Sequence, residues 1–541
     1  MLTWQNTGDP CTPETLTFVN HLCPTRVGYT TGLGPVAFST LSSPTVNNTA
    51  DVNYLPRGMS YLDASGNQKM LFTLPTKVYL FEGGVSGAAI TDVTRAAPYT
   101  AGLIFNFALF RDVVYAVNGS DLLQKSTGGA FTDVATTPKL SRICTWGDRM
   151  FGIGNVASFT SGGTPYAASQ YRYWISGIGN PEQYDSAIDS TAYTQDILDE
   201  GGPLTACVVL RDFVVMFKKS AVYVIEATGV PADPYVRRVV SNYYGCAWPD
   251  SIIEINNVLY WISPTRSGEV CAFDGAQITV LSGAIKSTVI DQRGIDYEDG
   301  FFTGSVVGNQ TGITVATDGE TIYWSSLLLT TMTAVATKQL CMNIATNRFG
   351  YSDKLTGTNS PMMVTSNATQ DAMMCVYPSS IALSNHNFKV GHIKRQDSLT
   401  GTAEFYRGNG KDFFSIQNAT LRFSEYTDAG LVDTQITTNF PSGSAATTPA
   451  YSGTPTLKVS STKNSGDAVT KTESSAVTPI TASWNSVTSA FDISQAGHRS
   501  KSARTFAFLM TVSPKNSLTG IAVDNDPSGK AQAGAKTNAW Q

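Results

Sequence analysis

The sequence predicts an all-β protein, in which a β-propeller of about six blades is followed by a second, β-sandwich-like domain. Short apolar segments rich in branched and aromatic residues recur along most of the chain, separated by tight turns. Charged residues make up only 15% of the 541 residues, a proportion that favours strands and turns over long surface helices or disorder. One stretch, 251–282, packs four such segments into the length of a single propeller blade.

This stretch shows the expected blade most clearly. Its predicted strands are Ser251–Ile255, Val258–Ser263, Glu269–Phe273 and Gln277–Ser282. Asn256-Asn257 supplies the first turn, because asparagine tolerates a positive φ, and Asp274-Gly275 supplies the last. Four short antiparallel strands joined by turns therefore account for the whole stretch.

The same pattern recurs on both sides of this blade. An apolar strand, a polar corner and a second apolar strand occur at Arg111-Asp112, Gly147-Asp148 and Arg211-Asp212. The spacing of about 35–65 residues suits propeller repeats with loops of variable length. The repeats are too divergent for a firm count, so six blades are the choice and five or seven stay possible. The repeats lack the Gly-His and Trp-Asp pairs of WD40 blades, and their double glycines do not hold the fixed position of a kelch repeat.

Changes in composition divide the chain into five parts. Residues 384–402 are polar and basic and are expected to form a linker, whereas the last residues are rich in Ala, Gly and Lys. The predicted parts are an irregular N-terminal segment (1–57), the propeller (58–383), the linker (384–402), a sandwich-like domain (403–523) and a flexible tail (524–541).

Charge and hydropathy restrict the classes of partner. The net charge is −5, so any contact with nucleic acid is expected to be weak and independent of base sequence. The N-terminus lacks the basic and apolar regions of a secretory signal, and the most apolar stretches are too short to span a bilayer. We therefore expect synthesis in a cytoplasm and no direct membrane insertion.

The eight cysteines are scattered, without a Cys-x-x-Cys motif, and most lie within predicted strands. This favours buried, reduced thiols over a disulfide framework. A disulfide between Cys11 and Cys23 stays an open alternative, because these two are the one pair that lies close in sequence.

No motif indicates catalysis. The four histidines lack metal-ligand spacing, and His386 and His392 fall in the predicted linker, where solvated side chains are expected. The neighbouring carboxylates Asp199-Glu200 and Glu298-Asp299 are interpreted as loop charges and not as an acid/base pair. We predict no catalytic, cofactor-binding or metal-binding residues, no cofactor and no enzymatic activity.

A resemblance to a known family rests on eight segments of the sequence, which are Trp174–Glu182, Gly201–Thr205, Phe217–Ile225, Val240–Cys246, Leu259–Ser263, Val270–Gly275, Phe405–Phe414 and Arg499–Gly520. They resemble the nozzle or tail-hub proteins of short-tailed phages, a group similar to packaged-DNA stabilisation proteins and tail tubular protein B. The early Arg26-Val-Gly-Tyr29 resembles an Arg-Pro-Gly segment of that family, with Val in place of Pro.

The resemblance implies a structural virion protein. Such a protein forms a ring, expected to be a hexamer, below the portal and its adaptor ring in the phage tail. The ring helps to retain the packaged double-stranded DNA and conducts it through the lumen, without reading it, during genome ejection. Tail fibres or spikes attach outside, and a plug or needle closes the far end. The tail Asp524–Gln541 is a candidate for partner contact.

Two alternatives stay open. One is a propeller that binds glycans or proteins, for which Trp146, Trp248 and Trp324 could face the ligand, although packing between blades is the favoured interpretation of these tryptophans. The other is a glycan-cleaving tail enzyme, which would need an Asp-box series and paired carboxylates in a cleft. The sequence shows neither.

Overall fold

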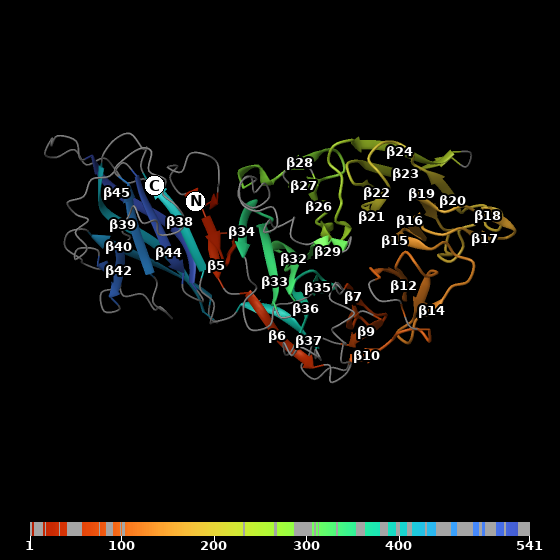
Figure 1. The fold of residues 1–541 in the computed structure, drawn as a ribbon, viewed down its shortest axis with the longest axis horizontal. Coiled ribbons are helices and arrows are strands. Elements are labelled where there is room, and N and C mark those ends of the chain that lie inside the picture. Colours follow the sequence, from red (N-terminus) through yellow and green to blue (C-terminus); the bar gives the residue numbers. More distant parts are fainter. Residues whose placement is uncertain are drawn as a thin grey trace.

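The fold is a seven-bladed β-propeller (Figure 1). The computed structural model describes residues 3–4, 15–16, 18–26, 28–31, 33–40, 57–74, 76–82, 90–97, 99, 103–230, 233–264, 268–285, 306–307, 310–311, 313–331, 334–352, 363–378, 388–395, 401–407, 414–427, 430–439, 456–462, 480–485, 490–492, 505–512 and 516–527. Within these ranges the only helices are two short 3-10 turns, Pro249–Ser251 (η1) and Ser282–Ala284 (η2). No helix in the described ranges has the length and hydrophobicity that crossing a bilayer requires.

The first four blades are each built from four antiparallel strands that pair mainly with their neighbours in sequence. Their strands are β7 (Gly58–Leu62), β8 (Gln68–Leu74), β9 (Lys77–Glu82) and β10 (Ile90–Asp92); β11 (Asn106–Phe110), β12 (Val113–Val117), β13 (Gln124–Ser126) and β14 (Thr132–Asp133); β15 (Leu140–Trp146), β16 (Arg149–Asn155), β19 (Ser169–Ile175) and β20 (Tyr193–Asp196); and β21 (Leu204–Leu210), β22 (Phe213–Lys218), β23 (Val222–Val230) and β24 (Asp233–Ser241). Blade 3 also carries the hairpin β17 (Phe159–Ser161) and β18 (Thr164–Tyr166).

Blades 5 to 7 complete the ring. Their strands are β25 (Ile253–Ile255), β26 (Val258–Ser263), β27 (Glu269–Phe273) and β28 (Ile278–Val280); β31 (Ile313–Thr317), β32 (Thr321–Thr331), β33 (Ala334–Asn343) and β34 (Arg348–Ser352); and β35 (Met363–Ser366), β36 (Met373–Pro378), β37 (Phe388–Arg395) and β6 (Leu33–Thr40). A short pair, β29 (Val306–Val307) and β30 (Gln310–Thr311), precedes blade 6. The first strand of a blade lies innermost, since β7 contacts both β11 and β35, and β15 contacts both β11 and β21.

The predicted polar corners are confirmed. Arg111, Gly147, Arg211 and the two residues Asn256 and Asn257 all have φ between 53° and 62°. Two-residue hairpins need this positive φ because their twist must match that of the flanking strands. Each corner joins the first strand of its blade to the second, so all of them lie on one face of the ring.

Aromatic side chains fill the spaces within and between the blades. Trp261 and Trp324 are fully buried, and their indole N–H groups donate hydrogen bonds to Gly245 O and Ser251 O, both at 3.0 Å. Trp261 also packs edge-on against Phe217 of blade 4, at 5.3 Å between ring centroids. These residues carry both apolar burial and satisfied polar atoms, as a tight inter-blade core requires.

The prediction of about six blades is wrong, since the structure has seven. The sequence pattern misses blade 7 because its strands come from distant parts of the chain. Its third strand, β37, lies inside the range predicted to be a linker (384–402), and its outermost strand, β6, lies in the segment predicted to be irregular (1–57). A repeat pattern read along the sequence detects only strands that follow one another. Strand β6, from the N-terminal part of the chain, closes the ring by pairing antiparallel with β37.

Further strands link the two ends of the chain. The N-terminal strands are β1 (Thr3–Trp4), β2 (Thr15–Leu16), β3 (Phe18–Asn20), β4 (Leu22–Pro24) and β5 (Tyr29–Thr31); the C-terminal strands are β38 (Gly401–Arg407), β39 (Phe414–Thr427), β40 (Gly430–Asn439), β41 (Thr456–Thr462), β42 (Ile480–Asn485), β43 (Ala490–Asp492), β44 (Thr505–Val512) and β45 (Asn516–Pro527). Strand β3 pairs with β38, and β4 and β5 lie between β34 of blade 6 and β45 in one nine-stranded sheet. That residues 403–523 form a separate sandwich-like domain stays a prediction.

Two further predictions from the sequence concern the C-terminal tail and the cysteines. Strand β45 extends to Pro527, into the predicted tail, and the rest of that tail lies outside the described residues. All seven cysteines in the described ranges have free thiols, as the sequence predicts. Cys11 lies outside these ranges, so a pair with Cys23 is not tested.

Candidate binding site between blades 3 and 4

A groove with a volume of about 760 Å³ opens between blades 3 and 4. Blade 3 contributes the corner Trp146–Arg149 and residues 190–193 before and within β20, and the hairpin β23–β24 of blade 4 forms the opposite wall. The corner Gly147-Asp148 places this groove on the face of the ring that carries the polar corners. Clefts of this size with a largely apolar lining are typical ligand sites.

Three aromatic rings form the floor. Trp146 is only 8% exposed, and its Nε1 donates a hydrogen bond to Asp212 O of blade 4 at 2.8 Å. Its ring lies 5.7 Å from that of Tyr235, which lies 5.0 Å from Tyr193. The indole is thus fixed across the blade boundary, and the two tyrosines continue its surface.

Arg149 is committed to the protein itself. Its Nη1 donates to Ser176 O at 2.8 Å and to Thr191 O at 2.5 Å, and its guanidinium lies 5.9 Å from the ring of Tyr235. Burial raises the pKa of Tyr235, and the nearby Arg149 offsets part of that rise. The phenol is therefore neutral at physiological pH, while Arg149 serves to hold the 176–191 loop against blade 3.

The rim of the groove is apolar and exposed. Ile178 on the blade 3 side is 58% exposed, and Val230 on the blade 4 hairpin is 53% exposed. Asp148 adds a carboxylate at the same edge, where it pairs with Arg111 of blade 2 at 3.2 Å with both side chains more than 60% exposed. Such an exposed pair contributes little to stability and can be displaced by a ligand.

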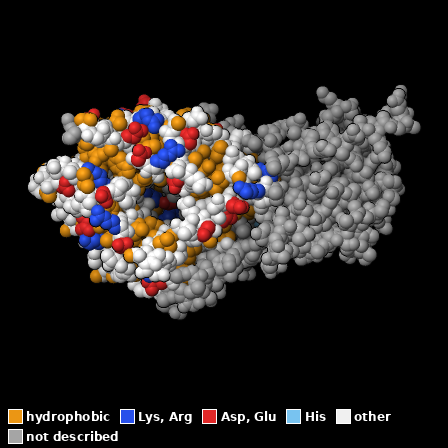
Figure 2. Space-filling view, turned by 180° about the vertical axis from the view of Figure 1, so that it is seen from behind, with side chains coloured by type: hydrophobic (Ala, Val, Ile, Leu, Met, Phe, Trp, Pro, Cys, Tyr) orange, Lys and Arg blue, Asp and Glu red, His pale blue; other side chains and the backbone are white. Residues whose placement is uncertain are grey.

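The propeller axis is a second cavity, of about 230 Å³, lined by the inner strands of the ring. Figure 2 shows an opening at the middle of the ring with basic side chains visible inside it. Asp250 contacts both Arg57 and Arg142 there, with the shortest N–O distances at 2.5 and 2.6 Å. These three side chains, none of them more than 17% exposed, tie blades 1 and 3 to the segment before blade 5.

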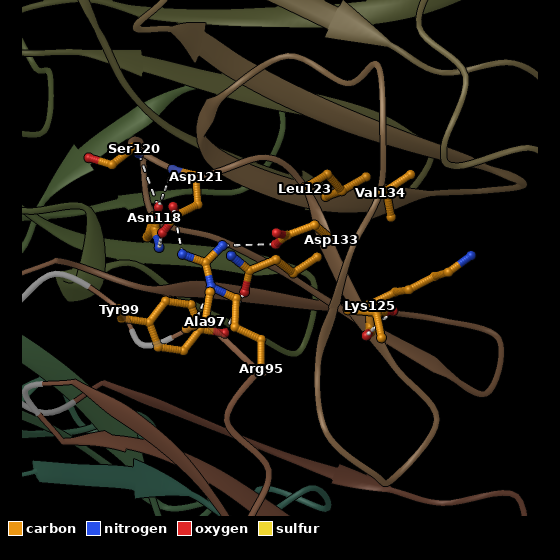
Figure 3. Close-up of polar contacts among 12 residues, drawn as sticks. Arg95, Ala97, Tyr99, Asn118, Ser120, Asp121, Leu123, Lys125, Asp133 and Val134 are labelled. Atoms are coloured by element: carbon orange, nitrogen blue, oxygen red, sulfur yellow. Dashed lines mark hydrogen bonds and ion pairs between the residues drawn. The ribbon is translucent and has the colours of Figure 1, made fainter.

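A second polar cluster lies between blades 1 and 2 (Figure 3). Arg95 bridges Asp121 and Asp133, each at 2.9 Å, and its guanidinium lies 4.7 Å from the ring of Tyr99. Asn118 accepts hydrogen bonds from Ser120 N and Asp121 N and donates to Asp121 Oδ2 at 2.8 Å. Because Arg95 holds both carboxylates, this pair is a structural link and not an acid/base couple.

The structure separates the three tryptophans that the sequence singles out. Trp146 lines the groove, whereas the packing predicted for Trp324 is confirmed by its complete burial. Trp248 is half-buried immediately before η1. Of these, Trp146 is the one that lines the groove.

The predicted loop charges and histidines lie elsewhere. Asp199 pairs with Arg237 at 3.0 Å, and His21 Nδ1 lies 3.0 Å from Ser352 Oγ. His386 and His498 lie outside the described residues, as does the Glu298-Asp299 pair, and only the backbone of His392 is described. In the part of the chain that the structure describes, no three His, Cys, Asp or Glu side chains come close enough to hold a metal ion.

Sequence reasoning missed Tyr235, Arg149 and the Asp250 cluster. Arg149 directly follows the predicted corner Gly147-Asp148, so that corner was the signal in the sequence that could have pointed to it. Tyr235 reaches the groove only because β23 and β24 are long enough to extend past their own blade, with a register shift between Ala227 and Val230. Asp250 follows Pro249 in a segment outside the strand pattern, and nothing local marks it as the centre of the ring.

Comparison with known proteins leaves the family open. No family model and no curated protein matches the chain. Solved structures that match include the WD40 repeats of RRP9 (8% identity, 66% of this chain, 100% of that one, TM-score 0.37) and YCF48 bound to D1 peptide (9%, 67%, 98%, 0.35). A third is the computationally designed Ika8 protein (9%, 72%, 99%, 0.32). At these scores the propeller assignment rests on the strand pairing of the chain itself.

Proposed function

We propose that this protein is a propeller-type binding module, and that the groove between blades 3 and 4 takes a segment of a partner protein. One observation carries this proposal: exposed Ile178 and Val230 stand on opposite sides of a cavity floored by Trp146, Tyr193 and Tyr235. Isolated exposed apolar residues are ordinary, but a pair that rims an aromatic cavity offers the anchor pocket of an interface.

The alternative ligand, a glycan, fits this groove less well. Glycan sites combine open aromatic faces with free hydrogen-bonding groups. Here the indole N–H of Trp146 and the guanidinium of Arg149 are already bonded within the protein, and the accessible rim is aliphatic. The exposed Asp148 favours a partner segment with a basic residue beside its apolar anchor.

A peptide array and a glycan array, each probed with the purified full chain, test the proposal. We expect retention on peptides that carry Leu, Ile or Val next to Lys or Arg. Tyr235→Ser should reduce this retention at least about tenfold, since it removes one aromatic anchor. Tyr243→Ser is the matched control, because Tyr243 is a 59% exposed tyrosine outside the groove. Retention on glycans alone, or an equal effect of both variants, would contradict a protein ligand in this groove.

A second candidate function is that of a ring component in the tail of a short-tailed phage, located in the virion. The sequence phrases described above suggest it, and one structural feature favours it. The nine-stranded sheet joins blade 6 through β4 and β5 to β45, so the hydrogen-bonded backbone runs without a break from the propeller into the C-terminal strands. Such a connection suits a part that must transmit load.

In this second function, DNA would pass between copies of the chain and not through one propeller. The axial cavity of about 230 Å³ is crossed by the Arg57–Asp250–Arg142 cluster and is far too small for a duplex. A lumen therefore needs several copies, which agrees with the proposed hexameric ring below a portal and adaptor. Images of tails with this protein labelled would test it: a single copy per tail, or a site away from the axis, would exclude the ring.

A further inference from the structure

The outer edge of blade 4 is longer than those of blades 1, 2, 3 and 5. In blade 7 the outermost strand, β6, has eight residues. Strand β24 has nine residues, whereas the outer strands β10, β14, β20 and β28 have two to four. The outer strand of blade 6, β34, pairs with β4. Within the described residues β24 pairs only with β23, so its outer side presents a long row of backbone N–H and C=O groups.

This edge carries two exposed valines beside two arginines. Val236 and Val239 are 46% and 47% exposed. A long exposed edge with apolar side chains invites another strand to pair with it, which is why most native edges are short, covered or charged. Blade 4 retains the features that the short outer strands of its neighbours avoid.

The charges on the edge select the kind of strand that can add. Arg237 and Arg238 lie between the two valines, with side chains 31% and 43% exposed. They form exposed ion pairs with Asp199 at 3.0 Å and with Glu226 at 3.6 Å, and an acidic ligand can displace such pairs because they contribute little to stability. A second copy of β24 pairing antiparallel across a two-fold axis would bring these arginines against their own copies, and like charges opposite one another are destabilising. An incoming strand with acidic residues meets no such penalty.

We propose that the outer edge of β24 is a docking site for an extended segment of a partner protein, in which two adjacent acidic residues are flanked by apolar ones. The segment would add to blade 4 as a fifth strand. Main-chain hydrogen bonds to β24 supply affinity, Val236 and Val239 contact the apolar side chains, and Arg237 and Arg238 select the acidic ones. Residues 236–239 do not line the groove, so the test of this edge does not depend on the groove ligand.

The test uses the full chain and two peptides as long as β24. One carries the order Val-Glu-Glu-Val at its centre and the other the order Val-Lys-Lys-Val. Hydrogen exchange measured with and without each peptide reports on the edge directly. We expect the glutamate peptide to slow amide exchange within 236–241, outside the groove lining, and to bind about tenfold more tightly than the lysine peptide. No slowing in β24, or equal binding of both peptides, overturns the proposal.

A matched pair of substitutions completes the test. Val239→Asp places a carboxylate on the edge and should weaken binding of the glutamate peptide about tenfold, through lost apolar contact and like-charge repulsion. Val156→Asp makes the same change at another exposed valine, 42% exposed on blade 3, and should leave binding unchanged. Both positions are exposed, and unchanged thermal unfolding of the two variants verifies the fold. An equal loss in both variants would overturn the assignment to β24.

Discussion

Arg142 and Asp250 meet at the axis of the propeller in a bidentate pair. Nη1 of Arg142 lies 2.6 Å from Oδ1 of Asp250, and Nη2 lies 3.3 Å from Oδ2. Arg57 donates to Oδ2 from the other side. Blade 3 and the start of blade 1 are thus joined through one carboxylate that precedes blade 5, so a local change at Asp250 affects three parts of the ring.

Asp250→Asn should destabilise the protein strongly. The substitution leaves two largely buried guanidinium groups without the negative charge that both contact, a change that typically costs about 3–5 kcal/mol. Asp148→Asn is the control, because it removes a carboxylate from the exposed pair with Arg111 and should cost less than about 1 kcal/mol. Urea denaturation of both variants measures the difference, and similar losses would contradict a special role for the axial cluster.

The axial carboxylate should also make stability depend on acidity. Burial raises the pKa of Asp250, but Arg142 and Arg57 together lower it by more, so the net shift is downward. Its contribution is therefore fully present above the unfolded-state pKa of about 3.9 and is lost as the pH falls through the lower folded value. The gap in unfolding free energy between wild type and Asp250→Asn should be constant near neutral pH and narrow below about pH 4. A gap that narrows as the pH rises would contradict this assignment.

The comparison of sequence and structure shows which features local pattern can predict. The corner at Arg211 was recognisable because a two-residue turn between two apolar runs leaves few conformations, and the chain adopts the positive φ that this turn needs. The same reasoning identified the strands of blade 5. Features that depend on residues far apart in sequence were not recognisable: β6 reaches β37 across most of the chain, and Tyr235 reaches Trp146 across a blade boundary.

Because β6 closes the ring, we expect residues 388–395 to resist proteolysis, although the sequence predicts a linker there. A linker at 384–402 would be the first site of proteolysis, but β37 within it is paired on one side with β36 and on the other with β6. Ala37→Pro, placed opposite Gly391, removes a backbone N–H from β6, and proline is poorly tolerated within a strand. We expect faster hydrogen exchange and new protease cleavage within 388–395.

The control places the same lesion in an outer strand that does not close the ring. Thr91→Pro lies in β10 of blade 1, which follows β9 directly in sequence. Its effect should stay within blade 1 and leave exchange in 388–395 unchanged. If Ala37→Pro also leaves that range protected, β6 does not hold blade 7 closed.

Gly245→Ala should be costly although Gly245 lies in no strand. A Cβ atom there would lie 2.3 Å from Lys218 O and 2.4 Å from the carbonyl carbon of Lys219, and backbone atoms cannot move aside as a flexible side chain can. The carbonyl of Gly245 also accepts the indole N–H of Trp261, so any displacement disturbs the core between blades 4 and 5. Overpacking of this kind costs about 1–3 kcal/mol.

Gly283→Ala provides the comparison, because nothing lies within 4 Å of its added Cβ. It should change the free energy of unfolding by less than about 0.5 kcal/mol, as an open surface position does. Urea denaturation followed by tryptophan fluorescence measures both variants, and Trp261 reports on the affected core. Equal stability of the two variants would mean that the segment around Gly245 can shift away from Lys218 at little cost, and that the close approach of these two backbones does not constrain the boundary between blades 4 and 5.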